Sequence, residues 1–458
     1  MTIGKPLPLQ WVVTPLEEIV LRIVGGGTPS KSKPEYYQGT IPWMSVKDMN
    51  KHVLHDTADH ISQLAVDNSS TNVIPAGTPI IATRMSLGKI VVADFDSAIN
   101  QDLKALFLSQ GIERDFLIYW YRSIAWQIEQ LGTGTTVKGI RLEVLKGLEF
   151  SLPALAEQKA IAEKLDTLLA QVENTKARLE RIPKILKRFR QSVLAAAVSG
   201  HLNAGVVENW KKVELIDVLE EKPRNGRSPK RVSYETPYRN LTLSATTPGY
   251  FVDGKFKYVE MDINDDSHLW VKKGDILIQR ANTIDYVGVS ALYRGADNYY
   301  VYPDLMMKCT ANEKVIPEFL HLALLSDSTR KYFRDNATGT SGNMPKINQK
   351  TVSETPILLP PIAEQTEIVR RVDQLFAYAD TIETQVNNAL ERVNNLTQSI
   401  LAKAFRGELT EQWRKDNPDL ISGENSAEAL LEKIKAERAA AKPAKKTRKK
   451  AASGIGHK

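Results

Sequence analysis

The chain has 458 residues, of which 42% are hydrophobic and 25% are charged, a composition typical of globular protein with room for two to four domains. No apolar run is long enough to cross a bilayer, the first nine residues lack the regions of a signal peptide, and Cys309, the only cysteine, excludes internal disulfides and cysteine metal clusters. The formal net charge of +7 fits a polyanionic partner, and the sequence predicts a cytoplasmic protein.

Residues 1–152 are predicted to form a first domain of mixed α and β structure. Short apolar segments are typical of strands, and one aromatic-rich segment is typical of a helix; they are a strand and short helix within 11–24, strands at 41–44, 78–83 and 89–93, and a helix at 115–131. Two polar loops interrupt them, at 25–33 and 132–141. Both loops carry basic and hydroxyl side chains.

Two later stretches, residues 153–202 and 360–409, align with each other without a gap at an offset of 207 positions (360 − 153). Each carries a heptad of mostly apolar residues, and the two heptads share one phase. The first is Ile161, Leu165, Leu168, Val172, Thr175, Leu179, Ile182, Leu186, Phe189 and Val193, and the second is Ile368, Val372, Leu375, Ala379, Ile382, Val386, Ala389, Val393, Leu396 and Ile400. A period of 3.5 needs a second helix with the same seam, so each stretch is predicted to pair with the other. The alternative is two unrelated amphipathic helices in separate cores.

Each of these rods should be a helix of roughly 60 Å, at about 1.5 Å of rise per residue. Pro153 and Pro360 stand before the helix starts, and Gly200 and Gly407 follow the last turns, where a left-handed cap suits glycine. Pro183 interrupts only the first rod, where we expect a kink or a short break rather than an end.

The region between the rods repeats the plan of the first domain with little sequence identity. Its predicted elements are strands at 238–244, 271–278 and 286–293, a helix at 317–333 and a threonine–glycine loop at 338–343. The predicted organisation is a domain at 1–152, a rod at 153–209, a domain at 210–359, a rod at 360–416, and a final linker, helix (427–440) and lysine-rich disordered tail within 417–458.

The sequence holds no recognisable catalytic constellation. A phosphate loop ending in Gly-Lys-Ser/Thr and a His-Glu-x-x-His motif are both missing. His52, His55 and His60 share one polar stretch, where a metal site is one interpretation and surface histidines the better one. Pro303-Asp304 resembles the start of a nuclease motif that nothing completes, and Pro360-Pro361 lacks the aromatic neighbour of an adenine methyltransferase loop.

Basic and hydroxyl side chains on loops remain as candidates for contact with DNA, because arginine and lysine bind phosphates and can pair with guanine in the major groove. In the first domain they are Lys31, Lys33, Arg84, Lys89, Thr133, Thr135, Lys138 and Arg141. In the second they are Arg224, Arg227, Lys230, Arg231, Arg239, Arg280, Thr338, Thr340 and Lys346. Taken singly, each is more often a solvated surface charge, and only their clustering in two matching domains favours the set.

The rods also carry a family resemblance. Residues 155–172 and 185–191 resemble the central conserved region of type I restriction–modification specificity subunits (HsdS), and residues 367–380 and 394–409 resemble the distal region; these motifs match the type IA branch closely. In the first domain, 26–30 together with 41–43 is similar to many target-recognition domains of that family. The second domain resembles the family chiefly in layout.

The resemblance implies a non-catalytic subunit of α+β class: two mixed α/β target-recognition domains joined by two long helices that form an intramolecular antiparallel coiled coil with pseudo-two-fold symmetry. Each domain would read one half of an asymmetric bipartite DNA target, with half-sites about one helical turn apart, roughly 34–36 Å. The implied partners are double-stranded DNA, two methyltransferase subunits (HsdM) that bind S-adenosylmethionine, and two restriction subunits (HsdR) that use ATP and Mg²⁺. No cofactor is expected in this chain.

The start of each rod carries a Glu-Gln pair, Glu157-Gln158 and Glu364-Gln365. We expect these residues to meet the partner subunits or to cap the helix bundle; the alternative is that they merely cap the first helical turn, where negative charge suits the helix dipole. For the whole chain, the alternatives to DNA recognition are a coiled-coil scaffold that binds proteins only and a self-sufficient methyltransferase.

Overall fold

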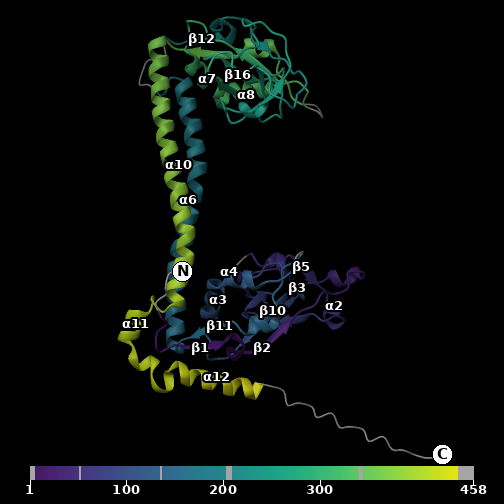
Figure 1. Cartoon of the computed structure of the whole chain (residues 1–458), viewed down its shortest axis with the longest axis vertical. Coiled ribbons are helices and arrows are strands. Elements are labelled where there is room, and N and C mark those ends of the chain that lie inside the picture. Colours follow the sequence, from purple (N-terminus) through teal and green to yellow (C-terminus); the bar gives the residue numbers. More distant parts are fainter. Residues whose placement is uncertain (1–5, 51–52, 135–136, 203–208, 340–343, 442–458) are drawn as a thin grey trace, which may run out of the picture. The chain divides into compact units, whose positions relative to one another are not determined.

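The computed structural model describes residues 6–50, 53–134, 137–202, 209–339 and 344–441. Contacts divide the chain into two units: residues 1–177 with 390–458 form unit 1, and residues 178–389 form unit 2. The boundary crosses the two long helices, α6 (Leu155–Val198) and α10 (Ile362–Phe405), so that each unit contains a part of both (Figure 1).

Unit 1 contains a five-stranded sheet of order β2-β10-β7-β8-β4, a four-stranded sheet of order β5-β3-β9-β6, and the pair β1-β11. Its strands are β1 (Val12–Pro15), β2 (Val20–Gly25), β3 (Ile41–Met44), β4 (Val53–Leu54), β5 (Asp59–Ile61), β6 (Asn72–Ile74), β7 (Ile80–Ala82), β8 (Ile90–Ala93), β9 (Ser97–Ile99), β10 (Leu103–Leu108) and β11 (Glu149–Leu152). Its shorter helices are α1 (Leu16–Ile19), η1 (Pro34–Tyr37), η2 (Val46–Asp48), α2 (Gln63–Asp67), α3 (Arg114–Ser123), α4 (Ala125–Leu131), α5 (Leu142–Lys146), α11 (Glu411–Asp416), η6 (Pro418–Ile421), η7 (Gly423–Asn425) and α12 (Ala427–Ala441).

Unit 2 contains a four-stranded sheet of order β13-β18-β16-β17 and the pairs β12-β19 and β14-β15. Its strands are β12 (Lys211–Glu214), β13 (Arg224–Asn225), β14 (Tyr238–Leu241), β15 (Phe256–Val259), β16 (Ile276–Gln279), β17 (Ser290–Leu292), β18 (Met306–Cys309) and β19 (Pro356–Leu359). Its shorter helices are η4 (Leu215–Val218), η5 (Leu243–Ala245), α7 (Pro317–Leu325), α8 (Asp327–Asp335) and α9 (Gln349–Ser353).

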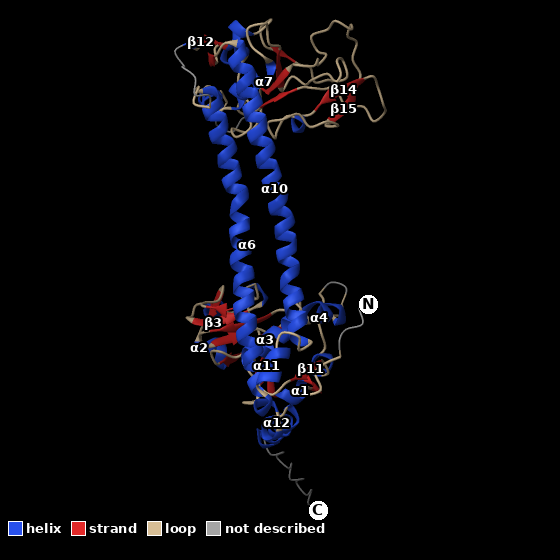
Figure 2. Ribbon diagram, turned by 90° about the vertical axis from the view of Figure 1, so that its left-hand side faces the viewer, coloured by secondary structure: helices blue, strands red, loops and turns tan. Residues whose placement is uncertain are grey.

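The two units share one strand plan. In the order of neighbours within the sheet, β13-β18-β16-β17 of unit 2 repeats β2-β10-β7-β8 of unit 1, and all of these pairings are antiparallel. The pair β12-β19 likewise repeats β1-β11, each joining the first strand of a unit to the strand that leads into a long helix. The doubled plan expected from the sequence is therefore confirmed. Figure 2 shows the strands of each unit gathered beside the paired helices.

The two long helices pack on each other through the predicted seam, in antiparallel fashion. In unit 1 the start of α6 (Ile161, Leu165) shares one apolar core with the end of α10 (Ile400, Ala404). In unit 2 the end of α6 shares a core with the start of α10; its seam residues are Val193, Ala197, Ile368 and Val372. Figures 1 and 2 both show α6 and α10 side by side. The intramolecular coiled coil is thus confirmed.

The ends of the helices also follow the sequence. α6 continues through Pro183 instead of ending there. Gly200 and Gly407 adopt φ of 80° and 74°, the left-handed conformation expected of a glycine after the last turn. At α10 the N–H of Glu408 then bonds the Lys403 carbonyl at 2.9 Å, which satisfies one of the free carbonyls at the helix end.

Two predicted helices are each split in two. The stretch 115–131 forms α3 and α4, which meet at Ile124, and 317–333 spans α7 and α8. The break before α8 has a clear cause: Ser326 is extended (ψ 148°), and its hydroxyl accepts from the Thr329 N–H, so the serine starts a new helix. Within the described ranges, no helix is both long and apolar enough to span a membrane.

Candidate nucleic-acid interface

In unit 1, an arginine, an aspartate and a hairpin loop meet beyond the end of β7. Arg84 follows β7, and its guanidinium lies 3.5 Å from the carboxylate of Asp102, which precedes β10. The loop that leaves α4 is closed on itself by two bonds of 2.9 Å between Thr133 and Gly139. It is joined to the arginine segment because the Met85 N–H donates to the Lys138 carbonyl, also at 2.9 Å. The side chains of Arg84, Thr133 and Lys138 are all exposed.

Unit 2 repeats this cluster with different side chains. Arg280 follows β16, and its guanidinium donates to the main-chain carbonyl of Asp304 at 3.2 Å. The loop that leaves α8 is closed by two bonds between Thr338 and Lys346, of 2.8 and 2.9 Å. The Ile347 N–H then donates to the Arg280 carbonyl at 2.9 Å, which joins the loop to the arginine. The strand register aligns Arg280 with Thr83, whose carbonyl likewise accepts from the Ile140 N–H, so Arg280 lies one position before Ala281, the residue that aligns with Arg84.

A second loop reaches the same turn in each unit, held by a glycine that nothing larger could replace. A Cβ on Gly26 would lie 1.9 Å from the Ile99 carbonyl oxygen, and one on Gly226 would lie 2.1 Å from that of Tyr302. Two residues further on, the hydroxyl of Thr28 donates to Gln101. In unit 2 the equivalent donor is Ser228, whose acceptor is Asp304. The two units therefore match in their loops more closely than the sequence alone indicated. We name the two sites cluster 1 (Thr28, Arg84, Met85, Asp102, Thr133 and the segment 137–139) and cluster 2 (Ser228, Arg280, Asp304, Thr338 and the segment 344–346).

The other described candidates of unit 1 are exposed. Lys33 donates to the Tyr36 hydroxyl at 3.0 Å, which raises the pKa of the lysine, and Lys89 donates to Asn50 at 2.6 Å. Arg141 occupies the N-cap position of α5 without a side-chain cap hydrogen bond, and Lys31 is exposed in the loop after Thr28. Thr135 lies outside the described residues.

The candidates of unit 2 divide into two groups. Arg227 joins cluster 2, because its N–H donates to the Tyr302 carbonyl at 3.0 Å and it adjoins Ser228. Arg224 pairs instead with Glu221 at 2.7 Å, and Arg239 lies over the ring of Tyr299, 4.5 Å from its centroid. Lys230 and Arg231 are exposed at the following loop, and Thr340 lies outside the described residues. The structure thus brings Arg227, Arg280, Thr338 and Lys346 together and leaves Arg224 and Arg239 with partners of their own.

The glutamines of the rod starts are buried and hold each long helix to its own unit. The Gln158 side chain accepts from the Glu113 N–H at 2.8 Å and donates to the carbonyls of Gly111 and Pro153, at 3.2 and 3.1 Å. Gln365 does the same with the Ile316 N–H at 2.8 Å and with the carbonyls of Lys314 and Pro360, at 3.0 and 2.8 Å. Both side chains are fully buried.

The preceding glutamates each accept from the indole N–H of a tryptophan. Trp11 donates to Glu157 at 2.9 Å, and Trp210 donates to Glu364 at 2.8 Å. Glu157 is fully buried and also accepts from Thr410 at 2.7 Å and Arg414 at 2.5 Å, both from the segment after α10. These contacts favour a role inside the chain for the Glu-Gln pairs, beyond a cap on the first turn. The sequence signal for it was a tryptophan at the start of each domain.

Two histidines of the polar stretch 52–60 each lie beside an aspartate carboxylate. His55 Nδ1 lies 2.5 Å from Asp94 Oδ2, and His60 Nε2 lies 2.9 Å from Asp56 Oδ1; His52 lies outside the described residues. Among the residues that the structure describes, no group of three or more His, Cys, Asp or Glu side chains could hold a metal ion.

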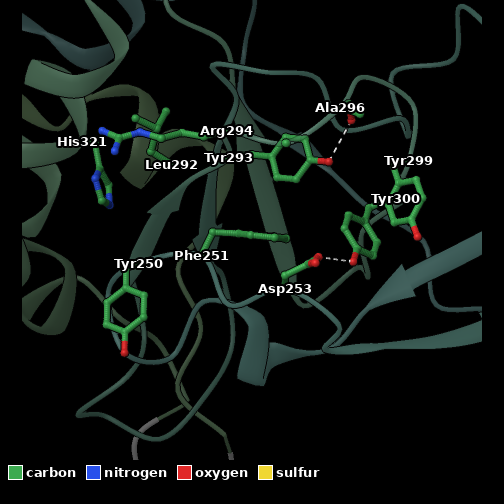
Figure 3. A pocket seen from close by; sticks show the side chains of 11 residues that line it. Tyr250, Phe251, Asp253, Leu292, Tyr293, Arg294, Ala296, Tyr299, Tyr300 and His321 are labelled. Atoms are coloured by element: carbon green, nitrogen blue, oxygen red, sulfur yellow. Dashed lines mark hydrogen bonds between the residues drawn. The ribbon is translucent and has the colours of Figure 1, made fainter.

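Sequence reasoning missed an aromatic pocket at the opposite end of the unit 2 sheet from cluster 2. Its lining includes Phe251, Tyr293, Tyr300 and His321 (Figure 3). The hydroxyls are already used, since Tyr293 donates to the Ala296 carbonyl at 2.8 Å and Tyr300 donates to Asp253. Burial lowers the pKa of His321 to about 4, so this ring is neutral near pH 7. The wall formed by Phe251, Tyr293 and Tyr300 is therefore part of a hydrophobic core cluster of unit 2.

Comparisons with known proteins agree with the doubled plan. The family model described as "Type I restriction modification DNA specificity domain" matches residues 8–184 and again 207–392. The chain is 38% identical over 481 residues to the type I restriction enzyme EcoKI specificity subunit of Escherichia coli K12, covering 98% of this chain and 100% of that protein. It is 43% identical over 366 residues to the StySPI specificity subunit of Salmonella potsdam, covering 78% of this chain and 79% of that one.

Solved structures show the same fold. An HsdS subunit from Thermoanaerobacter tengcongensis matches with a TM-score of 0.59 and 20% identity, over 89% of this chain and 100% of that chain. A chain from a structural study of assembly and conformational transition in the type I R-M system matches with a TM-score of 0.66 and 19% identity, over 88% of this chain and 100% of that one.

Proposed function

Because this chain belongs to the type I restriction–modification DNA specificity family, we propose that it reads an asymmetric bipartite DNA target, one half-site with cluster 1 and the other with cluster 2. The chain is a specificity subunit, and its relatives support the type IA branch. One observation carries the proposal: two units of one strand plan present a loop closed at the same place and an arginine at one of two adjacent positions after the matching strand, with different side chains around them. Unlike clusters should select unlike half-sites.

In this proposal Arg84 and Arg280 read bases, and the lysines and hydroxyls around them hold the DNA backbone. A guanidinium can pair with the O6 and N7 of guanine in the major groove, whereas lysine and threonine side chains serve well as phosphate donors. Arg84 is suited to this because its side chain is 54% exposed and only loosely paired with Asp102. Arg224 and Arg239, which have other partners, are weaker candidates.

The proposal includes the domain bounds given by the sequence: recognition domains at 1–152 and 210–359, helical spacers at 153–209 and 360–416 that set the length of the unread gap, and a linker with short helix and basic tail at 417–458. It also includes two methyltransferase subunits, which would supply S-adenosylmethionine chemistry, and two restriction subunits, which would use ATP and Mg²⁺. A cytoplasmic location follows, because the DNA to be read lies there.

Mapping of methylated adenines in a host that expresses the chain with its methyltransferase subunit tests the proposal. We expect one motif with two different specified halves and an unspecified gap. Arg84→Ala should relax one half only and Arg280→Ala the other only. A continuous or palindromic motif, or no motif at all, would contradict it; in the last case a band shift with mixed duplexes tests the alternative, a scaffold that binds only proteins.

Partner binding by Glu157, Gln158, Glu364 and Gln365 stays a prediction. The side chains of Glu157, Gln158 and Gln365 are fully buried, so they would act by positioning the helix start and not by touching the partner. Titration of the methyltransferase subunit with Gln158→Ala and Gln365→Ala tests it. An unchanged affinity would remove the partner role from both glutamines and leave the internal one.

A further inference from the structure

Cluster 1 contains one residue whose conformation the fold does not explain. Met85 has φ of 65°, a left-handed value that is uncommon outside glycine, asparagine and aspartate. The N–H of Ser86 closes the turn around it by donating to the Arg84 carbonyl at 2.8 Å, which makes a three-residue turn with a strained central residue. Glycine would adopt this turn without strain. Strain that is retained at a binding surface points to a function for the side chain.

The Met85 side chain is also outside the core. It is 61% exposed, while Leu87, two residues later in the same turn, is only 5% exposed and fills the apolar interior. Packing therefore does not require a methionine at position 85. The turn instead presents an apolar, flexible side chain between Arg84 and Lys138, whose carbonyl the Met85 N–H contacts at 2.9 Å.

Cluster 2 presents a methionine at its own hairpin. Met344 is 49% exposed and directly precedes Pro345, whose carbonyl accepts from the Asn282 N–H at 3.3 Å. Asn282 lies two residues after Arg280. Each cluster thus carries an exposed methionine beside the segment of its arginine, although the two methionines come from different segments of their units.

The chemistry of the major groove restricts what such a side chain can contact. Base edges there are hydrogen-bond donors and acceptors, and the one apolar group among them is the C5 methyl of thymine. A thioether has no strong donor or acceptor, so it gains most from an apolar surface. We propose that Met85 packs against the C5 methyl of a thymine next to the base pair that Arg84 reads, and that Met344 does so in the other half-site. This rests on the proposed function of the two clusters.

The test replaces thymine by deoxyuridine, which removes only the methyl group. The purified complex of the chain with its methyltransferase subunit is titrated with labelled duplexes of the mapped target, each with one thymine replaced. We expect one position in the cluster 1 half-site where deoxyuridine weakens binding roughly fourfold, the value of about one buried methyl group. The same exchange should have no effect on Met85→Ala, and Met344→Ala should abolish the effect only in the other half-site.

Two outcomes would overturn the inference: no thymine whose methyl matters, or a Met85→Ala loss that is equal on thymine and deoxyuridine duplexes. Leu64→Ala, at an exposed leucine of α2 that is 52% accessible, is the matched control and should change neither. Met85→Gly should raise the melting temperature while it weakens binding, because it removes both the strain and the contact; a lower melting temperature would contradict the strain. If the wild-type complex does not distinguish its target from a scrambled duplex, the proposed function fails instead.

Discussion

Gln158 in unit 1 and Gln365 in unit 2 make the same three hydrogen bonds, whereas the glutamates before them have different surroundings. Glu157 is fully buried and ion-paired with Arg414, whereas Glu364 is only half-buried and accepts from Trp210. Both units therefore keep the bonds that orient the helix against the sheet. What varies is the segment that contacts the glutamate, because in unit 1 the residues after α10 supply Thr410 and Arg414 to Glu157.

The largest expected difference between the units comes from this glutamate. Glu157→Gln leaves the guanidinium of Arg414, a side chain only 11% exposed, without its charge partner, and should lower the free energy of unfolding by about 3–5 kcal/mol. Glu364→Gln keeps an oxygen that accepts from the Trp210 indole but removes its charge, so the half-buried bond is weakened and the change should cost about 1 kcal/mol. Urea denaturation of the two variants measures both. Equal losses would show that Arg414 does not depend on Glu157.

His321 should make unit 2 sensitive to acid in a way that unit 1 is not. Burial, followed by the charge of Arg294, lowers the pKa of His321 to about 4, below the ordinary value of 6.5. The unfolded chain therefore binds a proton first, so stability falls as pH drops from about 7 to 4, by up to about 3 kcal/mol, and levels off below. Glu113 and Ile316 are equivalent positions, because each donates its N–H to the glutamine of its unit. His321 lies five residues after Ile316, and the residue five after Glu113 is Ile118, which does not titrate.

Thermal unfolding from pH 7.5 to 5 checks this, with hydrogen exchange to follow each unit separately. His321→Leu should flatten the pH dependence of unit 2 over that range. A slope that persists in the variant would assign the effect to other groups, of which His268, with a pKa also lowered by burial, is the next candidate.

The two arginines that we propose as base readers should differ moderately in their effect on DNA discrimination. Arg280 is held by the Asp304 carbonyl at 3.2 Å and is half-buried, whereas Arg84 is more exposed and 3.5 Å from Asp102. Arg280→Ala should cost about 2 kcal/mol of discrimination at one base pair, and Arg84→Ala about 1 kcal/mol. Competition titrations with single-base variants of each half-site measure both. A uniform loss over all sequences would mean that the arginine contacts phosphate.

The smallest expected effect lies on the coiled coil of unit 2. Arg190 pairs with Asp380 at 2.6 Å and Glu383 at 2.8 Å across the seam, but both carboxylates are substantially exposed. Arg190→Met should therefore lower stability by about 0.5 kcal/mol, and 1 M salt should remove the difference from wild type. A loss that is independent of salt would indicate packing by the arginine stem.

The sequence predicted the long helices well because a heptad is a local signal that each residue carries in its own spacing. It predicted both starts to within two residues, and the caps at Gly200 and Gly407. It missed the break at Ser326, although a serine before an acidic residue is a helix-start signal, because the apolar pattern continued through it.

The candidate site was predicted where the residues adjoin strands and missed where contacts come from distant segments. Arg84 and Lys138 could be grouped because each lies next to a predicted element. Arg239 could not be separated from them, since its partner Tyr299 is 60 positions away and the contact depends on how β14 packs. The domain bounds and the individual DNA contacts stay predictions.

All three bonds of Gln158, and all three of Gln365, end on main-chain atoms. A main-chain atom is present whatever amino acid occupies the position, proline donors excepted. Side-chain substitutions in the recognition module therefore leave the hydrogen bonds between the module and the long helix in place. New loops can arise around each arginine without any matching change in the helix, and this is the condition under which a recognition protein can diversify its targets quickly.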